Sequence, residues 1–279
     1  MKPFGVLKFE VTLPDNKKIL LEGLDEALAV RKLFWRGFDG VYPGFSEVFF
    51  RLSSSSNVII DLGSYFGYYS LIAAKANPEA RIFSVDPVES SMDLQTRIFT
   101  ANAVSNVTLC RVAISERSGK TAFYMPGFSH SSIPNIGSLV NRFGPGTHYS
   151  DRGSIETEVD AMRLDEFVDF YKIGHVDLIK FFVEEMETSV FNSGKRTLEK
   201  YQPDLIGWIF YRNTNVERLG QILKEVGYSF FVFKGPELVP CGSLEDARER
   251  GDVFGNAGRS AVFCTTKPDE RMKYLRRAC

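Results

Sequence analysis

Residues 58–67 read VIIDLGSYFG, and this stretch indicates the fold class of the chain. The apolar run at its start is typical of a strand that is buried on both faces of a parallel sheet. Gly63 and Gly67 then allow a tight turn in which the backbone approaches a ligand with no Cβ in the way. The helix that follows, through Ala76, directs free amide groups toward the same crevice. The stretch therefore predicts a strand, a ligand-binding turn and a helix, although such a turn can also be purely structural.

Strand and helix patterns alternate along the chain after residue 57. The expected strands are 58–62, 81–86, 107–114, 176–183 and 205–211, with a closing antiparallel pair at 228–233 and 260–265. The helix after the fourth of these strands is expected to continue through Lys200. Alternation of this kind favours an α/β fold, a mostly parallel Rossmann-like sheet with helices on both faces.

Two segments depart from this alternation. Residues 1–56 predict a small α+β appendage, with a hairpin at 4–22 and helices at 24–35 and 45–52. The remainder of the chain, residues 57–279, contains a stretch rich in Gly, Ser, Pro and Asn at about 125–157. A loop this long inside a compact domain is typical of a lid over a site. Residues 267–277 are basic and predict a solvated helix.

Composition excludes several classes of protein. The chain has 279 residues, of which 44% are hydrophobic and 25% charged, as in an ordinary globular protein. A net charge of −1 argues against a nucleic-acid partner. The four cysteines are scattered, with neither metal-ligand spacing nor a disulfide framework, so no metal site is predicted. No apolar segment resembles a signal peptide or a membrane span, and we therefore expect a cytoplasmic protein.

Asp86 ends the second predicted strand, where an acid meets the ribose in nucleoside-binding α/β folds. The alternative is an acidic cap for the helix that begins after Pro87. The glycine turn upstream favours the nucleoside interpretation. This turn lacks the G-x-G-x-x-G spacing that cradles a pyrophosphate. It suits a ligand with a carboxylate and an ammonium group, the latter held by Asp61 through water.

The chain resembles the FkbM-type methyltransferases over roughly residues 40–230. The stretches that carry the resemblance are, in chain order, Gly40-Val41-Tyr42 with Glu47, DLGSYFGYYS at 61–70, Val85-Asp86-Pro87, Asn106-Val107, Ala113-Ile114-Ser115, Gly119, Gly137-Ser138-Leu139, Leu164-Asp165-Glu166-Phe167 and Asp177-Leu178-Ile179-Lys180. An ordered series is more specific than any one motif.

The resemblance implies a seven-stranded Rossmann-like class I methyltransferase fold with S-adenosylmethionine as the only required cofactor. It also implies O-methylation of a hydroxyl on a sugar, a glycan or a secondary metabolite. The residues expected to bind the cofactor are Asp61, Gly63, Ser64, Tyr65, Gly67, Asp86, Pro87 and Ala113.

One segment departs from the family pattern. The family typically reads Lys-Ile-Asp-Val-Glu-Gly-Ala-Glu after its fourth strand, whereas residues 180–187 read KFFVEEME. Phe182 therefore replaces the Asp and Glu185 replaces the Gly, at the place where the methyl acceptor is expected. Three interpretations follow. Glu184 or Glu185 has taken over the role, the acceptor needs no carboxylate there, or methyl transfer is impaired. A phenylalanine here could also stack on a flat or sugar-like acceptor.

Methyl transfer to a hydroxyl needs alignment, exclusion of water and removal of a proton. The candidate bases are Glu184, Glu187 and His130 or His148 of the loop. Lys180 is expected to orient a carboxylate or to lower the pKa of the acceptor.

Each candidate has a structural alternative. Glu187 could simply open the following helix, where an acid is favourable, and a loop histidine is often only solvated. Trp35 and Trp208 are expected in the core.

Other functions remain to be weighed against O-methylation. Transfer to a nitrogen, in an amino sugar or a peptide, needs no strong base. The Phe182 and Glu185 departures also fit an inactive cofactor-binding module that acts as a partner or regulator. A nicotinamide oxidoreductase is disfavoured, because the turn lacks the pyrophosphate-binding spacing.

Overall fold

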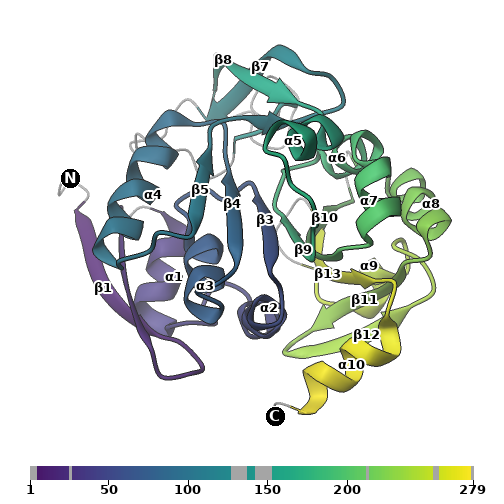
Figure 1. Ribbon diagram of the computed structural model, residues 1–279, viewed down its shortest axis with the longest axis horizontal. Coiled ribbons are helices and arrows are strands. Elements are labelled where there is room, and N and C mark those ends of the chain that lie inside the picture. Colours follow the sequence, from purple (N-terminus) through teal and green to yellow (C-terminus); the bar gives the residue numbers. More distant parts are fainter. Residues whose placement is uncertain are drawn as a thin grey trace.

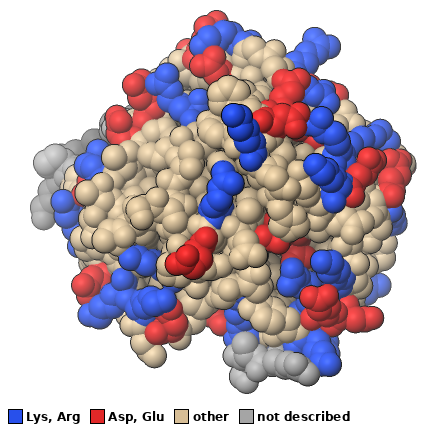
Figure 2. Space-filling model, in the orientation of Figure 1, with Lys and Arg blue, Asp and Glu red and all other residues tan. Residues whose placement is uncertain are grey.

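The structure is a computed structural model that describes residues 5–24, 27–126, 137–141, 153–211, 214–253 and 258–277. A twisted sheet runs through the molecule, with α1–α4 gathered on one side of the view and α5–α9 on the other (Figure 1). Acidic and basic side chains are interspersed over the face drawn in Figure 2, as the small net charge predicts. Among the helices in the described ranges, none has the length and apolar character needed to span a bilayer.

The main sheet has the order β12-β11-β13-β10-β9-β3-β4-β5. Its strands are β3 (Val58–Leu62), β4 (Arg81–Val85), β5 (Val107–Cys110), β9 (Leu178–Phe181), β10 (Asp204–Phe210), β11 (Ser229–Lys234), β12 (Glu237–Cys241) and β13 (Arg259–Thr265). The five strands from β5 to β10 are parallel, whereas β13 runs antiparallel between β10 and β11. This is the sheet of the class I methyltransferase fold, as predicted.

The sheet has eight strands rather than the expected seven, because β12 pairs with β11 as an added edge. Pro240 lies within β12. A proline argues against a strand in the interior of a sheet but is tolerated at an edge, which is why the sequence did not predict this strand.

Apolar side chains of the strands alternate between two cores. Ile59 faces one core with Ile82 and Trp208, whereas Ile60 faces the other with Ile179 and Leu205. The first core is covered by α2 (Phe45–Ser54), α3 (Tyr68–Ala76), α4 (Glu89–Ala101) and α10 (Pro268–Arg277), and the second by α5 (Leu164–Phe170), α6 (Glu187–Ser193), α7 (Lys195–Tyr201), α8 (Val216–Val226) and α9 (Ala247–Arg250). Both faces of the sheet are therefore covered, as parallel sheets require.

The single helix expected after the fourth strand is two helices, α6 and α7, which meet at Gly194. A Cβ on Gly194 would lie 2.4 Å from the Leu164 side chain. The break lets α5 pack closely against this junction, a contact that no local pattern in the sequence reveals.

A second sheet of three strands, in the order β6-β8-β7, lies beside the first. It comprises β6 (Ala113–Ile114), β7 (Gly119–Pro126) and β8 (Ser154–Met162). The strand expected at 107–114 is therefore wrong as a single element, because its apolar run continues from one sheet into another. The ends of the expected loop at 125–157 belong to β7 and β8, and residues 127–136 and 142–152 lie outside the described part of the chain.

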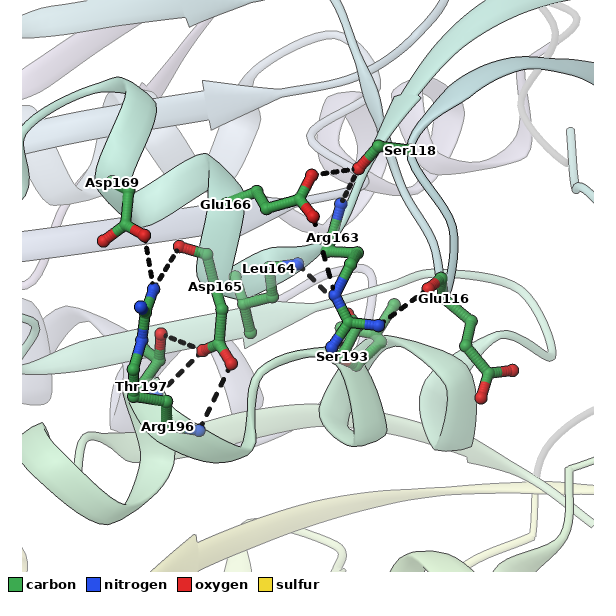
Figure 3. A network of polar contacts seen from close by, with 11 residues as sticks. Glu116, Ser118, Arg163, Leu164, Asp165, Glu166, Asp169, Ser193, Arg196 and Thr197 are labelled. Carbon is green, nitrogen blue, oxygen red and sulfur yellow. Dashed lines mark hydrogen bonds and ion pairs between the residues drawn. The ribbon is translucent and has the colours of Figure 1, made fainter.

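The LDEF stretch at 164–167 opens α5 and holds neighbouring elements together (Figure 3). The Asp165 carboxylate accepts hydrogen bonds from the backbone N and the hydroxyl of Thr197, at 2.9 and 2.7 Å. Glu166 accepts a hydrogen bond from Ser118, which directly precedes β7 of the second sheet. This part of the family resemblance therefore supports the scaffold by capping α7 and fixing the second sheet.

The N-terminal segment is a hairpin of β1 (Val6–Thr12) and β2 (Lys18–Leu24), followed by α1 (Leu28–Arg36) and α2. Its buried residues join the same core as α3 and α4. Trp208 is in the core as expected, but Trp35 is 79% exposed, so the prediction for Trp35 was wrong. Val30 and Leu33 define the buried face of α1, and Trp35 lies two positions beyond Leu33, on the opposite side of the helix.

Candidate active site

A cavity with a volume of about 250 Å³ lies at the carboxyl ends of β3, β4 and β9. The sheet order reverses at β3, because β4 follows on one side and β9 on the other. Ligands of open α/β sheets bind at such a switch point. Residues of α1, the segment before α2, and β13 complete the wall.

The cavity brings together residues that the sequence predicted from separate motifs. Those on its wall are Gly63, Ser64, Tyr65, Asp86, Pro87, Ala113, Lys180 and Glu184. Asp61, Gly67 and Glu187 do not line it. His130 and His148 lie outside the described residues.

The glycine turn is fixed from two sides. The backbone N atoms of Gly63 and Ser64 both donate to Val85 O of β4, at 2.9 and 3.0 Å. Gly63 has φ +68°, and a Cβ there would lie 2.0 Å from Phe182 O. Glycine is therefore required at position 63 by the close approach of the chain after β9, whether or not a ligand is bound.

A buried ion pair lies beneath the turn. Lys180 of β9 and Asp61 of β3 are 1% and 0% exposed, and their Nζ and Oδ1 atoms are 2.9 Å apart. Lys180 Nζ also donates to Gly63 O, at 2.9 Å. Burial lowers the pKa of Lys180, and the charge of Asp61 opposes this shift. Asp61 therefore anchors Lys180, and Lys180 in turn holds the turn backbone.

Polar side chains continue from this ion pair to α4. Ser70 donates to Asp61 Oδ2 at 2.7 Å, and its hydroxyl oxygen lies 2.7 Å from that of Ser84. Ser84 donates to Gln95 Oε1 at 2.6 Å, and Gln95 Nε2 donates to Ser64 Oγ at 3.0 Å. All of these side chains are buried. Sequence reasoning missed Ser70, Ser84 and Gln95 as supports of the site. The available signal was Gln95, a polar residue on the apolar face of the helix predicted after Asp86.

Asp86 stands at the end of β4 and is 8% exposed. Its carboxylate accepts from the backbone N atoms of Tyr65 and Val88, both at 3.0 Å. Burial raises the pKa of Asp86 to about 6, and the two amide hydrogen bonds oppose the rise. A carboxylate has about four acceptor positions, so Asp86 can accept further hydrogen bonds from hydroxyl groups of a ligand in the cavity.

The wall beside Asp86 is apolar. Val88, Val112, Ala113 and Ile114 line it, close to the second sheet. An acid that accepts hydrogen bonds next to an apolar slot is the arrangement that a nucleoside requires, with the acid on the ribose and the slot around the base.

The segment after β9 has an unusual backbone. Glu184 and Glu185 have φ values of +45° and +74°, in the left-handed region that favours glycine. Glu185 occupies the position where the family pattern has glycine, and its backbone takes a conformation that glycine adopts readily. Ser138 Oγ donates to Glu184 O at 2.7 Å and supports this turn. Glu184 lines the cavity, whereas Glu185 is buried.

Aromatic rings surround Phe182. The ring centroids of Phe45, Tyr69, Trp208 and Tyr42 lie 5.2, 5.4, 5.7 and 6.1 Å from its own. Lys180 Nζ lies 3.9 Å from the Phe182 centroid. The position that carries a carboxylate in the family is therefore part of an aromatic wall in contact with a cation.

Glu187 opens α6 and is fully buried. It accepts a hydrogen bond from the Thr214 hydroxyl and one from Glu185 N, the latter at 3.3 Å. Burial raises the pKa of Glu187 to about 8. This position favours the structural alternative, in which Glu187 supports the turn from behind.

Metal ligands do not gather at this site in the described part of the chain. No group of three or more His, Cys, Asp and Glu side chains lies close enough there to hold a metal ion.

Comparisons with known proteins agree with this geometry. The model of the methyltransferase FkbM domain family matches residues 61–230. A protein of Mycobacterium tuberculosis named a probable O-methyltransferase is 36% identical over 62 residues, which cover 22% of this chain and 27% of that protein.

Solved structures are similar at lower identity. A methyltransferase FkbM from Methylobacillus flagellatus is 15% identical with a TM-score of 0.47, over 75% of this chain and 43% of that one. TYW2 of M. jannaschii, solved in complex with S-adenosylmethionine, is 11% identical with a TM-score of 0.44, over 92% and 84% of the two chains. The chain thus spans less than half the length of the M. tuberculosis protein and of the Methylobacillus flagellatus protein.

The family match covers more than half of the chain and includes the turn, Asp86 and the segment after β9. The chain therefore belongs to the FkbM family of S-adenosylmethionine-dependent methyltransferases.

Proposed function

We propose that this protein transfers a methyl group from S-adenosylmethionine to a hydroxyl group of a sugar, a glycan or a secondary metabolite. The observation that carries the proposal is that one cavity contains both the glycine turn with Asp86 and, after β9, Glu184. A nucleoside-binding end and a carboxylate that can act as a base therefore share one enclosed space.

The residues that line the cavity fit the cofactor. Asp86 would accept hydrogen bonds from the ribose hydroxyls, Ala113 with Pro87 would border the base, and the turn at 63–65 would border the amino-acid part. Asp61 lies behind the wall, so we assign it the role of holding Lys180. Gly67 begins α3 and shapes the turn from behind, with φ +81°.

The bound cofactor supplies an electrophilic methyl group on a sulfonium. The chain then has to align the acceptor and exclude water, and alignment alone can contribute about 7–11 kcal/mol to lowering the barrier. The aromatic wall around Phe182 provides a dry surface for the acceptor. We treat residues 1–56 as an appendage on a methyltransferase domain at 57–279. The α1 helix of this appendage contributes residues to the wall of the cavity.

Glu184 is the proposed general base. Glu184 lines the cavity, and its backbone is held by Ser138. It would accept the proton that the hydroxyl loses as the oxygen attacks, which contributes typically 10²–10⁴-fold to rate. Lys180 interacts electrostatically with Glu184, and we propose that it orients this carboxylate. Glu187 is proposed as a support of this turn.

The test combines binding and turnover. Calorimetry should show that the protein binds S-adenosylhomocysteine, and mass spectrometry should show one added methyl group on a hydroxyl acceptor. Glu184→Gln should lower turnover at least tenfold with unchanged cofactor affinity, whereas Glu185→Gln serves as the matched control and should retain activity. Equal activity of Glu184→Gln and the unmodified protein would remove Glu184 as the base.

A second candidate is a module that binds the cofactor without methyl transfer. Phe182, in contact with Lys180 where the family has an acid, favours it. Tight binding of S-adenosylmethionine with no methylation across a broad acceptor panel would select this function. Transfer to nitrogen would show itself by a flat activity–pH profile, because an amine needs no strong base.

A further inference from the structure

Two positively charged side chains line the end of the cavity that lies beyond Phe182. Lys32 comes from α1 and Arg259 from β13, so elements from the two ends of the chain meet there. Both cations contact the ring of Tyr42, with Lys32 Nζ 5.5 Å and Arg259 Cζ 6.0 Å from its centroid. The two charges are therefore held around one aromatic ring.

Neither cation is neutralised by an acid. In the described ranges, no carboxylate forms an ion pair with Lys32 or Arg259. The hydrogen bond of Lys32 goes to Val41 O at 3.5 Å, and that of Arg259 Nη2 goes to the Tyr42 hydroxyl at 3.2 Å. Arg259 Nε is buried and has no hydrogen-bond partner among the residues that the structure describes. A buried donor of this kind costs free energy until a partner arrives.

The two cations also repel each other. The pKa of Lys32 is lowered, first by burial and then by the charges of Arg36 and Arg259. Like charges that are brought together on a cavity wall and partly removed from water are unfavourable without a ligand. An anion between them would relieve the repulsion and satisfy the guanidinium at the same time.

The surrounding surface indicates what carries the anion. Arg259 lies over the Trp208 ring, with its Cζ 5.0 Å from the ring centroid. The ring centroids of Tyr42 and Trp208 lie 4.0 Å apart. Flat aromatic surfaces stack against sugar or aromatic rings. Trp208 is buried beneath Arg259, whereas Tyr42 is partly exposed on the cavity wall. A ring that bears both a hydroxyl and an acidic group can therefore lie against Tyr42 with its acidic group on the cations.

We propose that Lys32 and Arg259 form an anion-binding subsite, and that the methyl acceptor is a hydroxyl compound with a carboxylate or phosphate group. This inference rests on the proposed function, because it specifies the acceptor of the same cavity. Lys32 and Arg259 would determine specificity by binding the acidic group, while Glu184 acts at the hydroxyl.

The test measures binding to the protein loaded with S-adenosylhomocysteine. Three matched pairs of probes are titrated by calorimetry: glucuronate against glucose, glucose 6-phosphate against glucose, and 4-hydroxybenzoate against 4-hydroxybenzamide. We expect at least one anion to bind at least tenfold more tightly than its neutral partner. Which pair shows the preference separates a carboxylate from a phosphate and a sugar from an aromatic ring.

Variants locate the preference. Lys32→Met and Arg259→Gln should each reduce the affinity for that anion at least tenfold, and Lys32→Arg should retain it. Arg31→Gln, an exposed cation of the same helix that does not line the cavity, is the matched control and should have no effect.

Two results would overturn the inference while leaving the proposed function intact. In the first, all three anions bind no more tightly than their neutral partners although S-adenosylhomocysteine binds normally. In the second, Lys32→Met and Arg259→Gln weaken S-adenosylhomocysteine itself, which would assign these cations to the cofactor carboxylate. Failure of the unmodified protein to bind S-adenosylhomocysteine would instead contradict the proposed function.

Discussion

The two ends of the cavity satisfy their charged groups in opposite ways. At the turn, Asp61 is paired with Lys180, and hydroxyl and amide side chains continue from this pair to α4. At the far end, Lys32 and Arg259 lie among aromatic rings with no acid partner in the described ranges. The first end is complete in the protein alone, whereas the second leaves charges that a ligand can neutralise.

This difference indicates that the two ends of the cavity have different roles. A buried ion pair with hydrogen-bonded neighbours fixes one arrangement of the backbone, which suits a cofactor that is the same in every turnover. An aromatic wall with free charges contributes little to stability but discriminates between acceptors. Substitutions at the two ends should therefore affect different measurements.

Lys180→Met should have the largest effect. It leaves the Asp61 carboxylate buried without its cation, and breaking a buried pair in this way costs about 3–5 kcal/mol. Chemical denaturation should show the loss in the free energy of unfolding. The double variant Asp61→Asn with Lys180→Met should recover most of it. Lys32→Met, the matched change at the far end, should change stability by about 0.5 kcal/mol or less, and a loss as large as that of Lys180→Met would abolish the distinction.

Asp86→Ala should come next and act on the cofactor. Removing the acid leaves the ribose hydroxyls without their acceptor, so we expect the affinity for S-adenosylhomocysteine to fall by about 100-fold or more, equivalent to roughly 3 kcal/mol. Because the pKa of Asp86 is about 6, affinity of the unmodified protein should also fall as the pH drops below 6 and the acid gains a proton. Unchanged calorimetric affinity in the variant would contradict the cofactor assignment.

Glu187 offers a comparison between two buried carboxylates. Asp61 is paired with the Lys180 cation, whereas Glu187 accepts hydrogen bonds from the Thr214 hydroxyl and the Glu185 amide. Burial raises the pKa of Glu187 to about 8 from 4.5. Between these two values the folded state keeps a proton that the unfolded state has lost. Stability should therefore fall as the pH rises from about 4.5 to 8, by at most about 1.4 kcal/mol per pH unit. Denaturation curves of Glu187→Gln across this range should lose that contribution, and an identical slope would show that Glu187 does not carry it.

Glu185→Gly should have the smallest effect and the opposite sign. Glu185 has φ +74°, and relief of a left-handed non-glycine residue outweighs the added freedom of glycine in the unfolded chain. We expect a gain of roughly 0.5–1 kcal/mol in the free energy of unfolding. Glu185→Ala removes the charge but keeps the strain, so it is the control and should give no gain. A destabilised glycine variant would indicate that the Glu185 side chain holds the turn.

Local patterns in the sequence were sufficient for the parallel sheet. The apolar run at 58–62, the turn glycines and Asp86 each signal their structure within a few residues, and Leu62, Gly63 and Asp86 line one cavity. The second sheet was not predictable in this way, because one apolar run at 107–114 is shared between two sheets. A pattern of side chains predicts burial but not the sheet in which a strand pairs.

Two parts of the site were harder to predict: the polar side chains behind the turn, and the end of the cavity at Lys32 and Arg259. Gln95 reads as an ordinary polar residue of a helix, and its contact with Ser64 depends on how α4 packs. Lys32 and Arg259 lie near the two ends of the chain and meet through tertiary structure alone. Sequence motifs report contacts between near neighbours, so the glycine turn was visible in the sequence and the acceptor wall was not.

The position of β13 has a consequence for the order in which the protein is made. This strand is inserted between β10 and β11, and it carries Arg259. A ribosome delivers the cofactor turn with β3 and β4 first, then β9, and β13 after every other strand of the sheet. Domains emerge and fold from the N-terminus at about 5–20 residues per second. The acceptor wall is therefore completed after the cofactor turn, and a nascent chain that has stopped short of β13 would hold the cofactor turn without the wall that selects its acceptor.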